Sequence, residues 1–336
     1  MTSNAQAHYS TRCHELAIPP PVCSTVRTMA KEQNRSSNTD LKSFRRVLAI
    51  LDGTSYAEHS LPIASEIASL AGATLQLAHT NLLLGATFAE RSLSFEETIG
   101  RHRQQHMRDY LEARARRLPY ERTEVLWEAL RGEQRVRDLE AIAGDDALIV
   151  MANRYRGVLG CFQFGSAAER LLSIGSSPIL FVKGYRWPVD VHSPRPIRKI
   201  LTYLDGTAGD EQIIPAAAAL SKAAASSHTL FGVVPTLPYV GVPWEEKLNE
   251  VKAYLWNTVD RLRNADNSCR LATEIRTSDA PLAQVILTYA QNSESDVIAV
   301  AARHRCTLSK LLSPHPAEYL VQYSRIPVLV TRSTTV

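Results

Sequence analysis

The stretch Phe44-Arg-Arg-Val-Leu-Ala-Ile-Leu-Asp52-Gly-Thr54 decides the fold, because the chain repeats it as Ile197-Arg-Lys-Ile-Leu-Thr-Tyr-Leu-Asp205-Gly-Thr207. The ends of the two copies match as well, since Ser177-Pro-Ile-Leu-Phe-Val182 corresponds to Ile326-Pro-Val-Leu-Val-Thr331. Asp205 follows Asp52 by 153 residues. Repeats of solenoid proteins have about 20 to 50 residues, so a repeat of this length is a whole domain.

Each copy begins with a short apolar run that ends at an Asp-Gly pair, as expected for a strand covered on both faces. Further apolar runs alternate with amphipathic helical patterns, which predicts an α/β fold with a parallel sheet flanked by helices. We expect strands at 47–51, 74–79, 123–127, 147–151 and 178–182, and again at 199–204, 229–234, 272–276, 297–301 and 328–331. Helices are expected at 56–71, 95–118, 136–143, 166–173, 244–262 and 280–290.

The 336 residues therefore divide into four parts, which are a flexible tail (1–43), a first domain (44–184), a linker (185–196) and a second domain (197–333). The tail is rich in Ser, Thr, Asn and Pro and has no amphipathic period, which favours disorder. The linker contains Pro188, Pro194 and Pro196, which stiffen it. Translation from Met1 and translation from Met29 are both compatible with the sequence.

Composition limits the partners and the compartment. With 38 basic and 34 acidic residues the net charge is +4, which suits an anionic ligand but is too small for nucleic-acid binding. The five cysteines form no C-x-x-C pair, so we expect no disulfide framework, no metal site and a reducing compartment. No apolar run approaches the roughly 20 residues of a membrane span, and no signal sequence precedes the first domain. A cytoplasmic protein without a membrane partner is predicted.

Open parallel sheets bind ligands at the carboxyl ends of their strands, which directs attention to two loops in each copy. One follows the first strand at Asp52 or Asp205, and the other follows the fourth strand, beginning at Ala152 or Ala302. Neither loop carries a G-x-S-x-G, H-E-x-x-H, Walker or dinucleotide glycine motif. The sequence therefore gives no positive evidence for catalysis, and we expect a protein that is not an enzyme.

The repeated copies and their loops after the first and fourth strands give the chain a family resemblance. It resembles two tandem universal stress protein (UspA-like) domains, each a five-stranded Rossmann-like unit. In that family the fourth strand leads into a G-x-x-G-x9-G-[ST] loop whose amides cradle the phosphates of ATP. In the first copy Met151 precedes this pattern, its glycine positions fall on Ala152, Tyr155 and Gly165, and its hydroxyl falls on Ser166. The resemblance thus implies an ATP or Mg-ATP site formed by Asp52, Met151, Ala152, Arg154, Tyr155, Gly165, Ser166 and Ala167, with Asp52 beside the nucleoside.

Both copies depart from the family pattern. Tyr155 brings a phenol and requires a negative φ where the family has glycine, whereas Arg154 and Arg156 are able to hold phosphate oxygens instead of the lost amides. The second copy has Pro314 and Pro316 where the Gly-Ser pair should be, and proline has no amide to donate. We therefore expect the second copy not to bind ATP.

Three functions are compatible with these residues. The first is a stress-response protein that binds an adenine nucleotide in the first domain and uses a degenerate second domain for structure or regulation. The second is a nucleotide-free interaction scaffold in which both sites are closed. The third and least favoured is an adenine-nucleotide-dependent transferase, because the loop after Asp52 has Glu58-His59 but lacks the histidine pair of such enzymes. The resemblance also implies an internal pseudo-dimer joined through the fifth strands, with further homo-oligomerisation left open.

Overall fold

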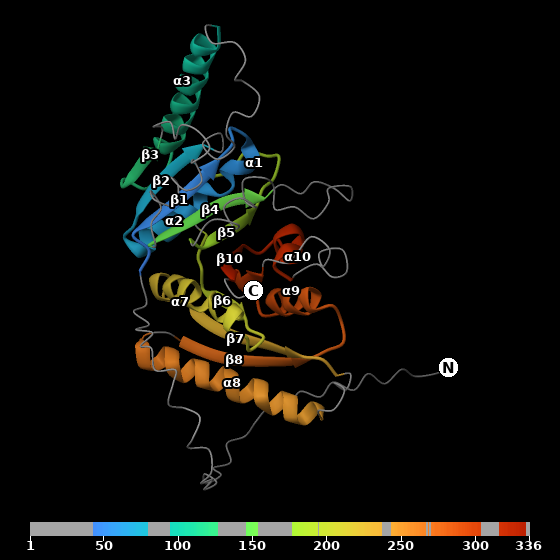
Figure 1. Cartoon of the computed structure of the whole chain (residues 1–336). Helices are drawn as coiled ribbons and strands as arrows, with labels where there is room; N and C mark the ends of the chain where they lie inside the picture. Colours follow the sequence, from blue (N-terminus) through green and yellow to red (C-terminus); the bar gives the residue numbers. More distant parts are fainter. Residues whose placement is uncertain are drawn as a thin grey trace, which may run out of the picture. The chain divides into compact units, whose positions relative to one another are not determined.

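The computed structural model describes residues 43–79, 95–126, 146–153, 177–193, 195–236, 243–266, 268, 270–303 and 316–333. Within these residues the strands form one ten-stranded sheet, ordered β3-β2-β1-β4-β5-β10-β9-β6-β7-β8 (Figure 1). The strands are β1 (Arg46–Leu51), β2 (Thr74–His79), β3 (Thr123–Leu126), β4 (Ala147–Asn153), β5 (Ile179–Lys183), β6 (Lys199–Tyr203), β7 (Ser227–Val234), β8 (Arg270–Thr277), β9 (Val297–Arg303) and β10 (Val328–Ser333).

The sheet consists of two halves with the same internal order. Each half is parallel throughout, and the order β3-β2-β1-β4-β5 returns as β8-β7-β6-β9-β10. The halves meet where β5 pairs antiparallel with β10, with Phe181 opposite Val328 and Ile179 opposite Val330. The predicted α/β class and the pairing through the fifth strands are confirmed.

The helices of the described residues are α1 (Ser55–Glu58), α2 (Leu61–Ala71), α3 (Phe95–Ala115), α6 (Ala208–Glu211), α7 (Ile214–Ala223), α8 (Trp244–Ala265), α9 (Leu282–Asn292) and α10 (Pro316–Tyr323). None of these helices is both long and apolar enough to cross a bilayer. The helices expected at 136–143 and 166–173 lie outside the described residues.

The single helix expected over 56–71 was a wrong prediction, because the structure divides it into α1 and α2. Pro62 stands in the first turn of α2, and a proline has no N–H to donate to the carbonyl four residues earlier. In the second copy Pro215 likewise stands in the first turn of α7, which follows the short helix α6. The break is therefore a repeated feature of the fold and sets where each short helix ends.

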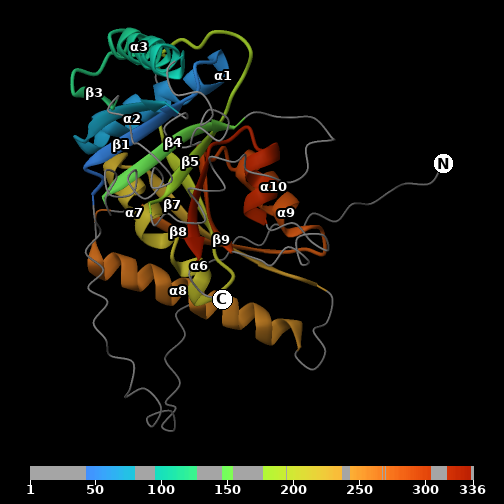
Figure 2. The ribbon, with the colours of Figure 1, turned by 45° about the horizontal axis from the view of Figure 1, so that its top comes forward.

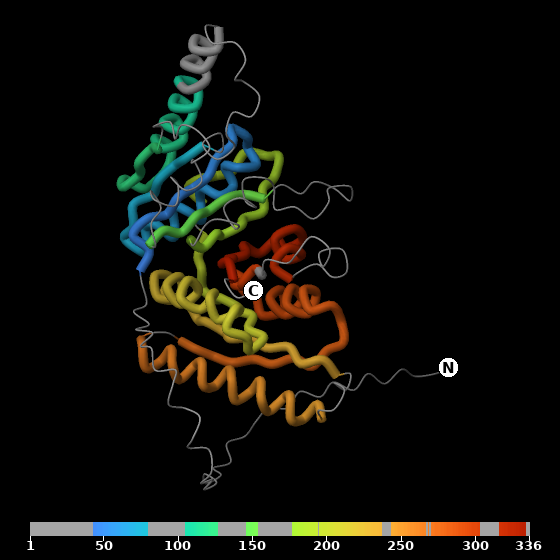
Figure 3. The backbone as a smooth tube through the Cα atoms, in the orientation of Figure 1, coloured from blue at the N-terminus to red at the C-terminus, as the bar shows by residue number. Residues whose placement is uncertain are grey.

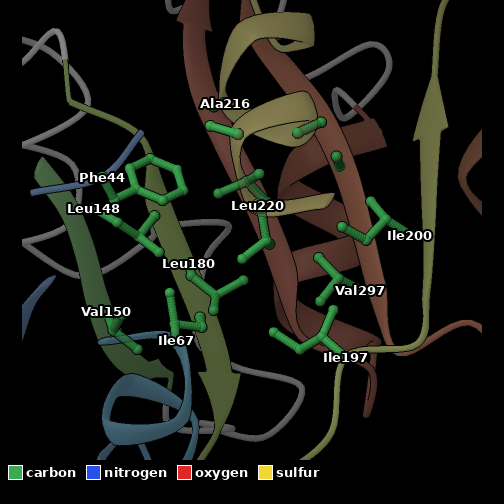
Figure 4. Packing of buried hydrophobic residues seen from close by; sticks show 14 of the residues in the cluster. Phe44, Ile67, Leu148, Val150, Leu180, Ile197, Ile200, Ala216, Leu220 and Val297 are labelled. Atoms are coloured by element: carbon green, nitrogen blue, oxygen red, sulfur yellow. The ribbon is translucent and has the colours of Figure 1, made fainter. Parts of the chain in front are cut away.

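Apolar residues form one core cluster on each face of the sheet. The first cluster includes residues of α2, α3, α7 and α8, whereas the second includes residues of α9 and α10, which lie on the opposite face (Figures 2 and 3). The first cluster crosses from one copy to the other, since it contains Phe44 and Leu180 together with Ile200 and Leu220 (Figure 4). Because these side chains share one buried core, we expect the two copies to unfold together.

Candidate functional site

Each half of the sheet has a topological switch point, where the strand order reverses. In the first copy β2 and β3 lie on one side of β1, and β4 lies on the other, so the reversal falls between β1 and β4. Ile50 of β1 pairs with Met151 of β4, which brings Asp52, Met151 and Ala152 to the same edge of the sheet. Open α/β sheets bind ligands in this crevice. The equivalent crevice of the second copy lies between β6 and β9, beside Asp205.

A tight turn holds Asp52 at this edge. Gly53 has a φ of 81°, a conformation that side chains rarely adopt, and Asp52 Oδ1 accepts hydrogen bonds from the Thr54 backbone N–H (3.0 Å) and hydroxyl. The second copy builds the same turn, with Gly206 at a φ of 90° and the Thr207 N–H 2.8 Å from Asp205 Oδ1. The aspartate therefore shapes the turn in both copies, and the turn alone does not distinguish a binding site.

His79 is a candidate site residue that the sequence analysis did not identify. It ends β2, pairs with Leu51 next to Asp52, and its Nε2 lies 3.6 Å from the position a Cβ on Gly53 would take. Burial lowers the pKa of His79, although the charge of Asp52 opposes this shift, so burial favours the neutral imidazole. A neutral imidazole offers one donor and one acceptor. The signal in the sequence was a histidine at the carboxyl end of an expected strand.

The second copy fills the corresponding space with its own residues. Gly232 stands at the position of His79, and a Cβ there would lie 2.8 Å from Val251 Cγ1, because α8 packs closely over β7. Asp210 replaces Ala57 and is buried, accepting a hydrogen bond from the Asp205 N–H (3.3 Å). The additional carboxylate makes this edge more acidic, which disfavours a phosphate.

The carboxyl end of β4 extends further than the sequence predicted. β4 runs through Asn153, so Ala152 lies in the strand and not at the start of a loop. Of the predicted site residues, Asp52, Met151 and Ala152 are brought together at the switch point. The others, Arg154, Tyr155, Gly165, Ser166 and Ala167, lie outside the described residues.

The pairing of the strands shows that the two copies align differently, by one residue, at the end of the fourth strand from what the sequence analysis expected. Ile149 pairs with Ile179 in the first copy and Ile298 pairs with Val328 in the second, so Ala152 corresponds to Ala301. The expected equivalence with Ala302 was therefore wrong.

With the corrected register, the sequence Arg154-Tyr-Arg156 corresponds to Arg303-His-Arg305. The sequence of each copy thus has an arginine on either side of an aromatic residue, at the end of the fourth strand or directly after it. Among the described residues of the second copy, α10 begins at Pro316, and a proline has no N–H to offer an anion.

An ion pair behind the Asp52 turn fixes α1 against α3. Glu58 accepts hydrogen bonds from the Arg114 Nε (2.8 Å) and the Tyr110 hydroxyl (3.1 Å), and burial followed by the Glu58 charge raises the pKa of Tyr110. The second copy has the same arrangement, with Arg261 3.1 Å from Glu211.

Among the described residues, no three His, Cys, Asp or Glu side chains gather to hold a metal ion.

Residues 196–332 match the model of the universal stress protein family. A solved universal stress protein from Archaeoglobus fulgidus has a similar structure, with a TM-score of 0.60 and 15% identity over 88% of this chain and 98% of that chain. A putative universal stress protein from Pseudomonas aeruginosa has a TM-score of 0.52 and 17% identity over 87% of this chain and 95% of that chain. A search of the curated proteins found no match. At these identities the structural likeness shows the fold alone.

Proposed function

We propose that this chain, whose residues 196–332 match the model of the universal stress protein family, is a stress-response protein that binds an adenine nucleotide in its first copy. Binding, without turnover, is the proposed activity. The second copy serves structure or regulation.

The observation that carries this proposal is the meeting of Asp52, His79 and the end of β4 at the switch point of the first copy. The carboxylate of Asp52 and the neutral imidazole of His79 supply hydrogen-bonding groups for a nucleoside, while Met151 and Ala152 line the neighbouring strand. The loop that starts at Arg154 would hold the phosphates, with Arg156, Gly165 and Ser166 as candidates.

The contrast between the copies supports one site per chain. In the second copy, Gly232 lies under Val251 and Asp210 adds a buried carboxylate. A nucleotide at the switch point of the second copy would therefore meet a helix that packs closely on the sheet. It would also meet a sheet edge that carries more negative charge. The first copy has His79 and Ala57 at the same positions.

The matched variants Asp52→Ala and Asp205→Ala test the proposal, because both remove the same turn-forming carboxylate and only one lies at the proposed site. Hydrogen bonds to charged groups contribute about 1.5–3 kcal/mol, so Asp52→Ala should weaken Mg-ATP binding by about tenfold or more in isothermal titration. Asp205→Ala should leave the affinity unchanged. Equal loss in both variants would mean that the turn acts through folding and not through the ligand.

A nucleotide-free scaffold is the second candidate, and the close packing at Gly232 and the buried carboxylate of Asp210 in the second copy favour it. If the first copy were closed as well, the wild-type protein would give no heat with Mg-ATP, and no nucleotide would be released on denaturing the purified protein. That result would support the scaffold.

A further inference from the structure

Helix α10 of the second copy contacts the end of β4 in the first copy. The Asn153 side-chain amide donates a hydrogen bond to the Val321 carbonyl oxygen over 2.9 Å. Val321 lies in the last turn of α10, where carbonyl groups have no partner within the helix. Asn153 therefore satisfies one of these carbonyls, although the two residues are 168 positions apart in the sequence.

Lys183 makes a second contact of the same kind on the neighbouring strand. Its ammonium group lies 2.9 Å from the Gln322 carbonyl oxygen, and Lys183 pairs with Asn153 across β4 and β5. A cation at the carboxyl end of a helix also interacts favourably with the helix dipole. Burial, followed by the charge of Arg325, lowers the pKa of Lys183. Two side chains from the first copy thus hold the last turn of α10.

The same end of β4 is connected to the Asp52 turn through the backbone of Gly184. The Gly184 N–H donates to the Asn153 carbonyl oxygen over 3.1 Å. On its other side Gly184 packs against α1, so closely that a Cβ would lie 2.8 Å from the Tyr56 carbonyl oxygen. The next turn of chain continues this contact, because the Ser55 hydroxyl donates to the Arg186 carbonyl oxygen over 3.1 Å.

We propose that α10 of the second copy is a positioning element of the first copy's ligand site. Its carbonyl groups at Val321 and Gln322 hold Asn153 and Lys183, which fixes the carboxyl ends of β4 and β5 beside Met151 and Ala152. Asn153 and Lys183 are positioning residues and need not touch the ligand. The ligand's identity rests on the proposed function, whereas the contact between the copies does not.

This arrangement gives the second copy a specific role. The site of the first copy is complete only when α10 is docked, so ligand binding and the order of α10 are linked. Such linkage is reciprocal, because a ligand that binds more tightly when α10 is docked must in turn stabilise the docked helix. An effector or protein that displaces α10 would weaken binding at the first copy.

Hydrogen exchange of the ligand-free protein tests the contact itself. Asn153→Ala and Lys183→Met each remove one donor, and loss of one hydrogen bond should speed exchange of the amides of Leu320–Ser324 by about fivefold. The control variants Asn249→Ala, on the exposed side of α8, and Lys222→Met, in the Asp266 ion pair, should leave these amides unchanged. Unchanged exchange in both test variants would overturn the proposal.

Adding Mg-ATP to the same proteins tests the coupling. In the wild-type protein a saturating ligand should slow exchange of the Leu320–Ser324 amides by about fivefold, whereas Asn153→Ala should bind about fivefold more weakly and show no such protection. A general loss of stability would not remove a ligand effect at saturation. If Asn153→Ala binds with wild-type affinity, the proposal fails and the nucleotide site stands.

A failure of the proposed nucleotide function and a failure of the proposal about α10 give different results. If the wild-type protein gives no heat with Mg-ATP, the proposed nucleotide function fails. In that case the ligand-free exchange experiment still decides whether α10 is held by the first copy. The isosteric change Asn153→Asp provides a second check, since it keeps the shape, removes the donor and should behave as Asn153→Ala does.

Discussion

Acidification should destabilise this protein through His228, a residue far from the proposed site. His228 lies in β7 and is fully buried, with its Nε2 2.7 Å from the Thr202 hydroxyl oxygen of β6. Its Nδ1 is buried without a hydrogen-bond partner among the described residues. Burial therefore lowers the pKa of His228 from 6.5 to about 4.

The size of the effect follows from the two pKa values. In the unfolded chain the imidazole takes up its proton near pH 6.5, whereas in the folded protein it does so only near pH 4. Between these values the unfolded state binds more protons, so the free energy of unfolding falls as the pH is lowered and levels off below pH 4. A difference of about 2.5 pKa units corresponds to about 3 kcal/mol. Domains have only about 5–15 kcal/mol of stability, so this loss is large.

Urea denaturation at about pH 7.5 and about pH 4.5 measures this loss in the wild-type protein, in His228→Gln and in the exposed-site control His192→Gln. The glutamine amide is able to keep the bond to Thr202 but does not titrate. His228→Gln should therefore lose about 2–3 kcal/mol less between the two pH values than the wild type and His192→Gln do. If all three proteins lose the same amount, His228 is not the group responsible and the reasoning from burial is refuted.

Two further changes test the framework of the site. Gly184→Ala places a methyl group 2.8 Å from the Tyr56 carbonyl oxygen, and such overpacking should lower the free energy of unfolding by about 1–3 kcal/mol, measured as a lower urea midpoint. Wild-type stability would show that the close contact is absent. Glu58→Gln should cost more than Glu211→Gln in thermal unfolding, because the Arg114 side chain is 25% exposed and the Arg261 side chain 59% exposed, and exposed ion pairs contribute little. The opposite order would contradict the burial argument.

Much of the fold was predictable because the signals are local and occur twice. Every strand expected from the apolar runs is present, with bounds that differ by a few residues. The helix over 56–71 was mispredicted because a helical pattern of apolar residues continues through Pro62, and the missing N–H outweighs the pattern. The repeat at Pro215 was available in the sequence and would have revealed the break.

The candidate site was harder to predict because its residues come from separate elements. Asp52 was found through its place after an apolar strand, but His79 depends on the pairing of β1 with β2. The hydrogen bond between Asn153 and Val321 depends on how α10 docks, and sequence spacing gives no sign of it. The equivalence of Ala152 with Ala301 likewise required the strand register.

The stoichiometry of Mg-ATP binding tests the central claim most directly. Titration of the full chain at protein concentrations well above the dissociation constant should give one nucleotide per chain, held by the first copy. Two nucleotides per chain would contradict the conclusion that Gly232, Val251 and Asp210 close the second copy. No bound nucleotide would contradict the assignment of the switch point beside Asp52 as a nucleotide site.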